Sequence, residues 1–126
     1  MKKLKFIKES MEELGLNYEF MEWKNEPVYP YFTGEYQETE PYTEDGLCES
    51  TFILNGFSRS EQGFYELEKA KDAIAAYFSP ISGRTAMADD GSAIAVFYSN
   101  SFYIPEEDAE LKRIQINLSI KEWKVM

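Results

Sequence analysis

The amino-acid sequence predicts an α+β fold: a mainly antiparallel sheet of about 5–6 strands with two helices packed on one face. Two observations lead to this prediction. Apolar residues recur at helical spacing in the segments 2–14 and 58–80, and they alternate with polar residues in the segments between and after them. The predicted order is helix, three strands, helix, three strands. The length of 126 residues suits a single domain over residues 1–126.

The first helix is predicted over residues 2–14, with Gly15 as the residue that ends it. Its apolar stripe consists of four residues spaced three or four positions apart: Leu4, Ile7, Met11 and Leu14. The next segment, NYEFMEW, alternates in polarity and predicts a short strand over residues 17–23.

The segment YPYFTGEY predicts a strand near residues 28–37 that tolerates proline at its start. Aromatic side chains fall on both of its faces, so one face can pack beneath the helices and the other needs cover from elsewhere. Residues 38–47 are predicted to form a loop, because Pro41 and Asp45-Gly46 are turn signals. The segment ESTFILNGFS, residues 49–58, predicts a return strand.

The second helix is predicted within residues 58–80. Ser58, followed three positions later by Glu61, fits a capping box, and Ser60 is a second candidate cap. Pro80 is expected to end this helix. Six residues form its predicted apolar stripe: Phe64, Leu67, Ala70, Ile74, Tyr77 and Phe78.

Three strands are predicted after this helix. The run Asp89-Asp90-Gly91-Ser92 is a hairpin signal between two strand-like segments. The second of them, AIAVFYS, places Ile94, Val96 and Tyr98 on one face. The last strand has the clearest alternation in the chain, with four apolar residues separated by polar ones: Ile114, Ile116, Leu118 and Ile120.

Composition excludes several classes of chemistry. There is no histidine, which removes Ser-His-Asp and Cys-His catalysis and every histidine metal site. The formal net charge of −10 disfavours binding to phosphate backbones and to anionic membranes. No phosphate-binding loop, dinucleotide fingerprint or EF-hand pattern occurs, and the lone Cys48 has no histidine to activate it. We therefore expect no enzyme activity, no cofactor and no membrane contact.

Two sets of residues are candidates for an interaction surface. The aromatic set comprises Tyr29, Tyr31, Tyr36, Tyr42 and Trp123, because tyrosine and tryptophan are enriched at protein interfaces. Packing in the protein's own core remains an equally open interpretation of these tyrosines. The acidic set is interpreted as solvated surface charge. Its members are Glu35, Glu38, Glu40, Glu44, Asp45, Asp89 and Asp90.

The chain resembles the tail-terminator, or tail-completion, proteins of long-tailed bacteriophages and prophages. Three features carry the resemblance: the early YPYFTGEY strand, the passage TFILNGFSRSEQGFYELEKAKDAI, and the long final strand ELKRIQINLSIKEWKV. The acidic loop 38–45 departs from that pattern. The resemblance implies a homo-oligomeric ring, usually a hexamer, that ends the tail tube and contacts the tail-tube and head-connector proteins. It also implies a place in the virion, with host cytoplasm before assembly, and DNA that passes through without being bound.

The charge is compatible with such a conduit, because six subunits at −10 would carry about −60 and repel phosphates. An alternative from another class is an acidic inhibitor or adaptor that mimics DNA and binds a basic protein surface. A carboxylate-based hydrolase is a third interpretation and ranks last, because glycosidases need carboxylates that converge from separate elements.

Overall fold

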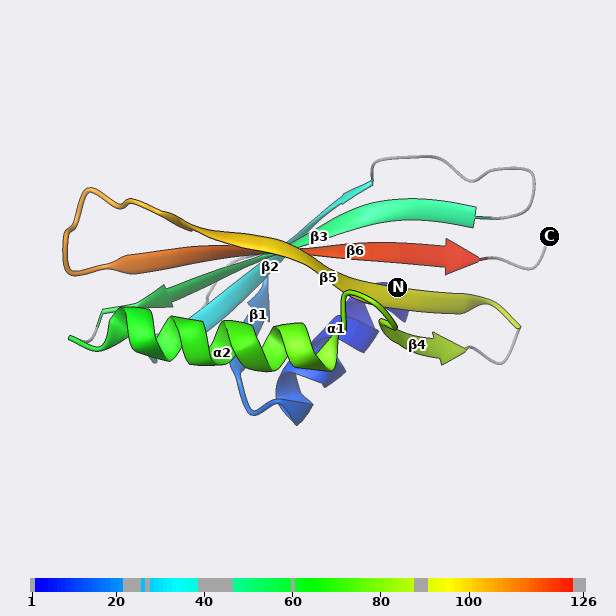
Figure 1. The fold of residues 1–126 in the computed structure, drawn as a ribbon, viewed down its shortest axis with the longest axis horizontal. Coiled ribbons are helices and arrows are strands. Elements are labelled where there is room, and N and C mark those ends of the chain that lie inside the picture. Colours follow the sequence, from blue (N-terminus) through cyan, green and yellow to red (C-terminus); the bar gives the residue numbers. More distant parts are fainter. Residues whose placement is uncertain are drawn as a thin grey trace.

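The computed structural model describes residues 2–21, 26, 28–38, 47–59, 61–87 and 91–123. The element order is the predicted one, with two helices and six strands among these residues. Their bounds are α1 Lys2–Glu13, β1 Asn17–Phe20, β2 Tyr31–Glu38, β3 Leu47–Ser58, α2 Gly63–Tyr77, β4 Arg84–Met87, β5 Ala93–Ile104 and β6 Lys112–Trp123 (Figure 1).

The six strands form one sheet in the order β1-β2-β3-β6-β5-β4. Four of the five neighbouring pairs are antiparallel, but β1 and β2 run parallel, so the sheet is mixed. A parallel pair requires the chain to travel back along β1 between Phe20 and Tyr31 before the second strand begins. Alternation of polar and apolar residues does not record strand direction, and the sequence pattern therefore did not reveal this pair.

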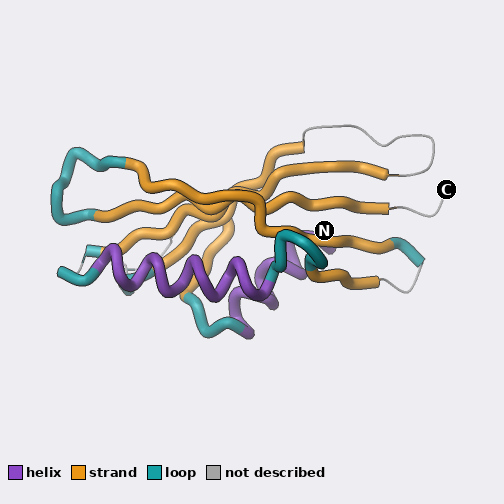
Figure 2. Tube along the Cα trace, in the orientation of Figure 1, coloured by secondary structure: helices purple, strands orange, loops and turns teal. Residues whose placement is uncertain are grey.

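Both helices lie on the same side of the sheet (Figures 1 and 2). Ile7 and Met11 of α1 and Leu67 and Ile74 of α2 join one buried apolar cluster with the sheet. The side chains that the sheet contributes stand on its helix-covered face: Phe32, Phe52, Leu54, Ile94, Val96, Ile114, Ile116, Leu118 and Ile120. The predicted one-sided core is therefore confirmed, including the alternation along β6.

Several predicted boundaries differ from the structure. β1 ends at Phe20, three residues short of the prediction, and residues 22–25 lie outside the described part of the chain. β2 begins at Tyr31 rather than near residue 28, because Pro30 has no N–H for a ladder hydrogen bond. Glu38 and Leu47 belong to β2 and β3, and the predicted loop narrows to residues 39–46, which are not described.

The predicted start of the second helix is wrong. α2 begins at Gly63, its N-cap residue is Gln62, and no side chain caps it. Ser58 instead ends β3, where it is fully buried. Ser60, the other predicted cap, lies outside the described residues. The strand keeps Ser58 because its backbone pairs with Lys112 of β6, and this pairing outweighs a local capping motif.

The apolar stripe of α2 is narrower than predicted. Leu67, Ala70, Ile74 and Phe78 are buried, but the ring of Phe64 is 53% exposed. Phe64 packs edge-on against Tyr103 of β5, with 5.1 Å between the ring centroids. It therefore covers the margin of the sheet rather than the centre of the core.

The predicted hairpin is present, since β4 and β5 pair antiparallel from Met87 and Ala93 onward. Residues 88–90 of the connecting turn are not described. A register shift between Tyr98 and Asn100 exchanges the faces of β5, so that Ser101 and Tyr103 follow Tyr98 on the helix-covered face. Neither described helix has the length and apolar content that a membrane span requires.

Candidate interaction surface

No described helix covers the face of the sheet opposite α1 and α2, and we call it the open face (Figures 1 and 2). Strand pairing determines its membership, because side chains alternate between the faces. The open face consists of the odd-numbered residues of β2, β3 and β6, together with Phe97, Asn100, Phe102 and Ile104 of β5.

Aromatic side chains gather at one end of the open face. The rings of Tyr29 and Tyr31 lie 5.4 Å apart, and Tyr31 stacks on Phe57 at 5.1 Å. We call Tyr29, Tyr31 and Phe57 the aromatic cluster. The guanidinium of Arg113 lies 5.6 Å from the centroid of Phe57, in range of a cation–π interaction. This end of the face therefore combines large amphipathic rings with a cation, the side chains that anchor protein interfaces.

A second arginine stands beside the aromatic cluster. Hydrogen bonds from Arg59 to Tyr29 and to Asp108 raise the pKa of its guanidinium, so it stays cationic. In return, Arg59 lowers the pKa of the Asp108 carboxyl, which keeps that group ionised near neutral pH. Both partners are well exposed, and the pair therefore orients Arg59 more than it stabilises the fold.

Uncharged polar side chains occupy the centre of the open face. Gln115 donates a hydrogen bond to Asn117 at 3.1 Å, and Asn117 donates one to Asn100 at 2.7 Å. From the aromatic end, Arg113 donates two bonds to the side-chain amide oxygen of Asn55, at 2.9 and 3.3 Å, and it also contacts Glu106 at 3.5 Å. These bonds hold the amide side chains against one another within the surface.

The far end of the open face is apolar again, with one ion pair. Lys121 lies 5.8 Å from the Phe97 ring centroid and 3.9 Å from the carboxylate of Glu49. Trp123 is 38% exposed at the end of β6, where alternation puts it on this face as the sequence predicts. Large aromatic side chains thus stand at both ends of the face, each beside a cation, and hydrogen-bonded amides lie between them.

The structure separates the predicted aromatic residues. Tyr31 belongs to the open face, but Tyr36 stands on the helix-covered face and packs against the core. This placement removes Tyr36 from the surface that Tyr31 occupies. Tyr42 lies outside the described residues.

The predicted acidic residues fall mostly outside the described part of the chain. Glu35 is exposed on the open face, and Glu38 is described only as a backbone position of β2. The remaining members lie outside the described residues: Glu40, Glu44, Asp45, Asp89 and Asp90. Within the described residues, no three acidic or cysteine side chains converge where they could hold a metal ion.

Sequence reasoning missed Phe57, Arg113 and the amide side chains as parts of one surface. Alternation assigns Phe57 and Arg113 to the polar sides of their strands. It does not show that β3 and β6 are neighbours in which these two residues pair directly. The sequence matches no family model, and no curated protein is similar to it at a significant level.

Proposed function

We propose that this chain is a structural subunit of a long-tailed bacteriophage or prophage, of the tail-terminator kind. In this function, copies of the chain form a ring that ends the tail tube and joins the tail to the head. The observation that carries the proposal is the open face, a side of the sheet that no described helix covers and that ends in the aromatic cluster. The resemblance of the sequence to tail-terminator proteins is the reason for proposing a ring as the form of assembly.

Ring assembly fits the distribution of side chains on the open face. A ring closes through heterologous contacts, in which two different patches of the same subunit meet. Aromatic anchors and arginine supply most of the binding energy in such contacts, and polar residues surround them. Tyr31, Phe57 and Arg113 provide the anchors at one end, and the row from Asn100 to Gln115 provides the polar surroundings.

The charge of the chain fits a wall past which DNA moves without being held. Six subunits at −10 would carry about −60, which repels phosphates at low salt. The two cations within the open face, Arg113 and Lys121, each lie beside a carboxylate, Glu106 at 3.5 Å and Glu49 at 3.9 Å. Such neutralised cations give little to a phosphate backbone.

The same charge supports a second candidate, an acidic inhibitor or adaptor that binds a basic protein in place of DNA. The exposed Glu35 and the acid-rich sequence that follows β2 would make its contact. Such a protein would act as a small unit, and salt would weaken its complex steeply.

Mass in solution and tube capping together test the proposal. We expect the chain, mixed with the tail-tube protein from the neighbouring genes, to form rings and to stop tube growth, as seen by electron microscopy and light scattering. A chain that stays monomeric beside growing tubes, and instead binds a basic enzyme with steep salt dependence, would replace the tail-terminator proposal with the inhibitor.

A further inference from the structure

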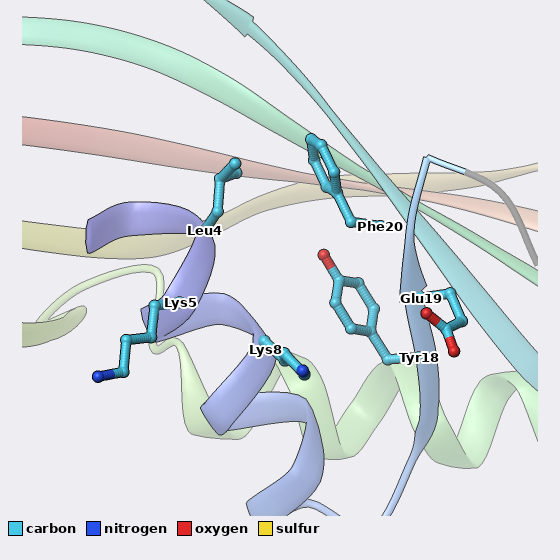
Figure 3. A pocket seen from close by; sticks show the side chains of 6 residues that line it. All are labelled: Leu4, Lys5, Lys8, Tyr18, Glu19 and Phe20. Carbon is cyan, nitrogen blue, oxygen red and sulfur yellow. The ribbon is translucent and has the colours of Figure 1, made fainter. Parts of the chain in front are cut away.

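A hollow of about 270 Å³ lies between α1 and β1, on the helix-covered side of the sheet (Figure 3). We call it the α1–β1 hollow. Six residues line it: Leu4, Lys5, Lys8, Tyr18, Glu19 and Phe20. Beside it, the side chain of Met21 is 61% exposed. Leu4, Phe20 and Met21 thus place apolar side chains in and beside the hollow, next to the two lysines.

The walls of the hollow are apolar, and its inner group is a phenol. Leu4 and Phe20 stand on opposite sides, and the Tyr18 hydroxyl points between them (Figure 3). Phe20 is held in place because its ring stacks on Phe52 at 6.2 Å. Burial, and secondarily the charge of Glu19, raises the pKa of Tyr18. Its hydroxyl therefore stays protonated and can donate a hydrogen bond. Among the described residues, no acceptor bonds to this hydroxyl.

Two lysines give the hollow its charge. The side chain of Lys8 extends toward Tyr18, whereas Lys5 points outward at the rim, 3.8 Å from Glu9 (Figure 3). Glu19 projects from the other side of β1 (Figure 3). Within the described residues, no carboxylate forms an ion pair with Lys8. An occupant that suits this hollow carries carboxylates together with a ring or another apolar group.

Charge along the chain is arranged so that a second copy can supply such an occupant. Residues 1–8 hold four lysines and no acid. The other 118 residues hold the remaining 9 bases and all 23 acids, which gives 9 − 23 = −14. Residues 38–45, ETEPYTED, hold four acids, one tyrosine and no base. Opposite charges on two different parts of one chain favour head-to-tail association of copies.

We propose that the α1–β1 hollow is a docking site for residues 38–45 of a second copy of this chain. The carboxylates of that segment pair with Lys8 and Lys5, and one of them accepts a hydrogen bond from the Tyr18 hydroxyl. The tyrosine of the segment packs between Leu4 and Phe20. This inference deepens the proposed function and rests on it, since it names the contact through which one subunit holds the next. Two unlike patches meet, as a closing ring requires.

A charge-swap experiment tests the docking site. One variant carries Lys5→Glu and Lys8→Glu, and a second carries Glu40→Lys and Glu44→Lys. In each variant alone, the hollow and residues 38–45 carry charges of the same sign and repel each other. The dissociation constant for self-association, measured by sedimentation velocity at low salt, should therefore rise by about tenfold or more. Mixed together, the two variants present complementary charges and should associate again, alternating around the assembly.

Matched controls separate the hollow from general charge effects. Lys69→Glu combined with Arg84→Glu, and Glu107→Lys combined with Glu110→Lys, reverse exposed side chains outside the proposed contact and change the charge by 2 × 2 = 4, as each swap variant does. These variants should associate as the unmodified chain does. Circular dichroism checks folding, and if Lys8→Glu unfolds the chain, the neutral Lys8→Gln variant should still weaken association.

Several outcomes would overturn the docking site. One is an unmodified chain that stays monomeric at about 1 mM and low salt. Others are association that neither swap variant weakens, and a mixture of the two variants that fails to recover association. A further outcome concerns the two swaps combined in one chain. If only that combination restores the free energy of unfolding, residues 38–45 occupy the hollow of their own chain, and this also overturns the proposal. Tube capping without dependence on the hollow rejects this inference and leaves the proposed function standing. Association that depends on the hollow, without capping of tail tubes, supports this inference and rejects the proposed function.

Discussion

Tyr31 and Tyr36 lie five residues apart on β2 and have opposite surroundings. Tyr31 stacks on Phe57 on the open face, whereas Tyr36 pairs across the strands with Phe52 and packs against the core. The tyrosines of this segment therefore divide between the open face, where Tyr31 lies, and the core, against which Tyr36 packs.

Substituting these two tyrosines separates assembly from folding. We expect Tyr36→Ser to lower the free energy of unfolding by at least about 2 kcal/mol, because it leaves a gap beside Phe52. Tyr31→Ser should lower it by no more than about 1.5 kcal/mol, the value of a ring–ring contact. Urea unfolding measures both changes. Tyr31→Ser should impair ring formation more than Tyr36→Ser does at temperatures where both are folded. If Tyr31→Ser unfolds the chain instead, the tyrosine belongs to the fold and not to an interface.

At the junction between β3 and α2, strand pairing determines where the helix begins. Ser58 is held in β3 by its pairing with Lys112, and α2 starts five residues later at Gly63. A side chain on Gly63 would lie 3.0 Å from Lys112 and 3.3 Å from the Ser58 hydroxyl oxygen. Strand and helix therefore meet closely at this point, and a Cβ atom at position 63 would require the Lys112 side chain or Ser58 to move by a few tenths of an ångström.

Ser58→Ala distinguishes this arrangement from a capping box. The buried Ser58 hydroxyl has no hydrogen-bond partner among the described residues, so its removal relieves a desolvation cost. We expect the free energy of unfolding to stay unchanged or to rise by up to about 1 kcal/mol. A true capping serine would instead lose about 1 kcal/mol when replaced by alanine. Thermal or urea unfolding of the variant decides between the two, and a loss of that size would restore the capping interpretation.

At the scale of the whole molecule, charge decides which partners can approach. The net charge of −10 combines a basic segment, residues 1–8, with an acidic remainder, so the molecule is polarised as well as acidic. Long-range repulsion from phosphates and short-range attraction between copies are therefore compatible in one chain.

We expect no retardation of duplex DNA by the unmodified chain in a gel-shift assay at about 150 mM salt. Reversing Glu107, Asp108 and Glu110 to lysine changes the charge by 3 × 2 = +6, from −10 to −4. It also places new cations beside Arg59 and Lys112, so this variant should retard DNA in a salt-dependent way. The single change Glu107→Gln, at an exposed side chain, is the control and should leave folding and DNA binding as they are. Tight DNA binding by the unmodified chain would contradict both the conduit and the DNA mimic.

Local patterns in the sequence determined the number, type and order of the elements. Ile114, Ile116, Leu118 and Ile120 specify a half-buried strand by themselves, because a period of two admits no other regular structure. The spacing of Leu67, Ala70 and Ile74 likewise specifies a helix, since 3.6 residues make one turn. Composition, too, can be read without the fold. The absence of histidine excludes histidine-dependent catalysis and metal sites, and the charge of −10 disfavours binding to phosphate backbones.

The tertiary structure alone decided which strands are neighbours, and therefore what each face contains. The parallel pairing of β1 with β2 joins Tyr18 and Phe20 to α1 and forms the α1–β1 hollow. The pairing of β3 with β6 brings Arg113 to Phe57. These contacts join residues far apart in the chain, and their energies depend on packing that no local window contains. The capping motif at Ser58 failed for the same reason, because a ladder formed with β6 competes with it and prevails.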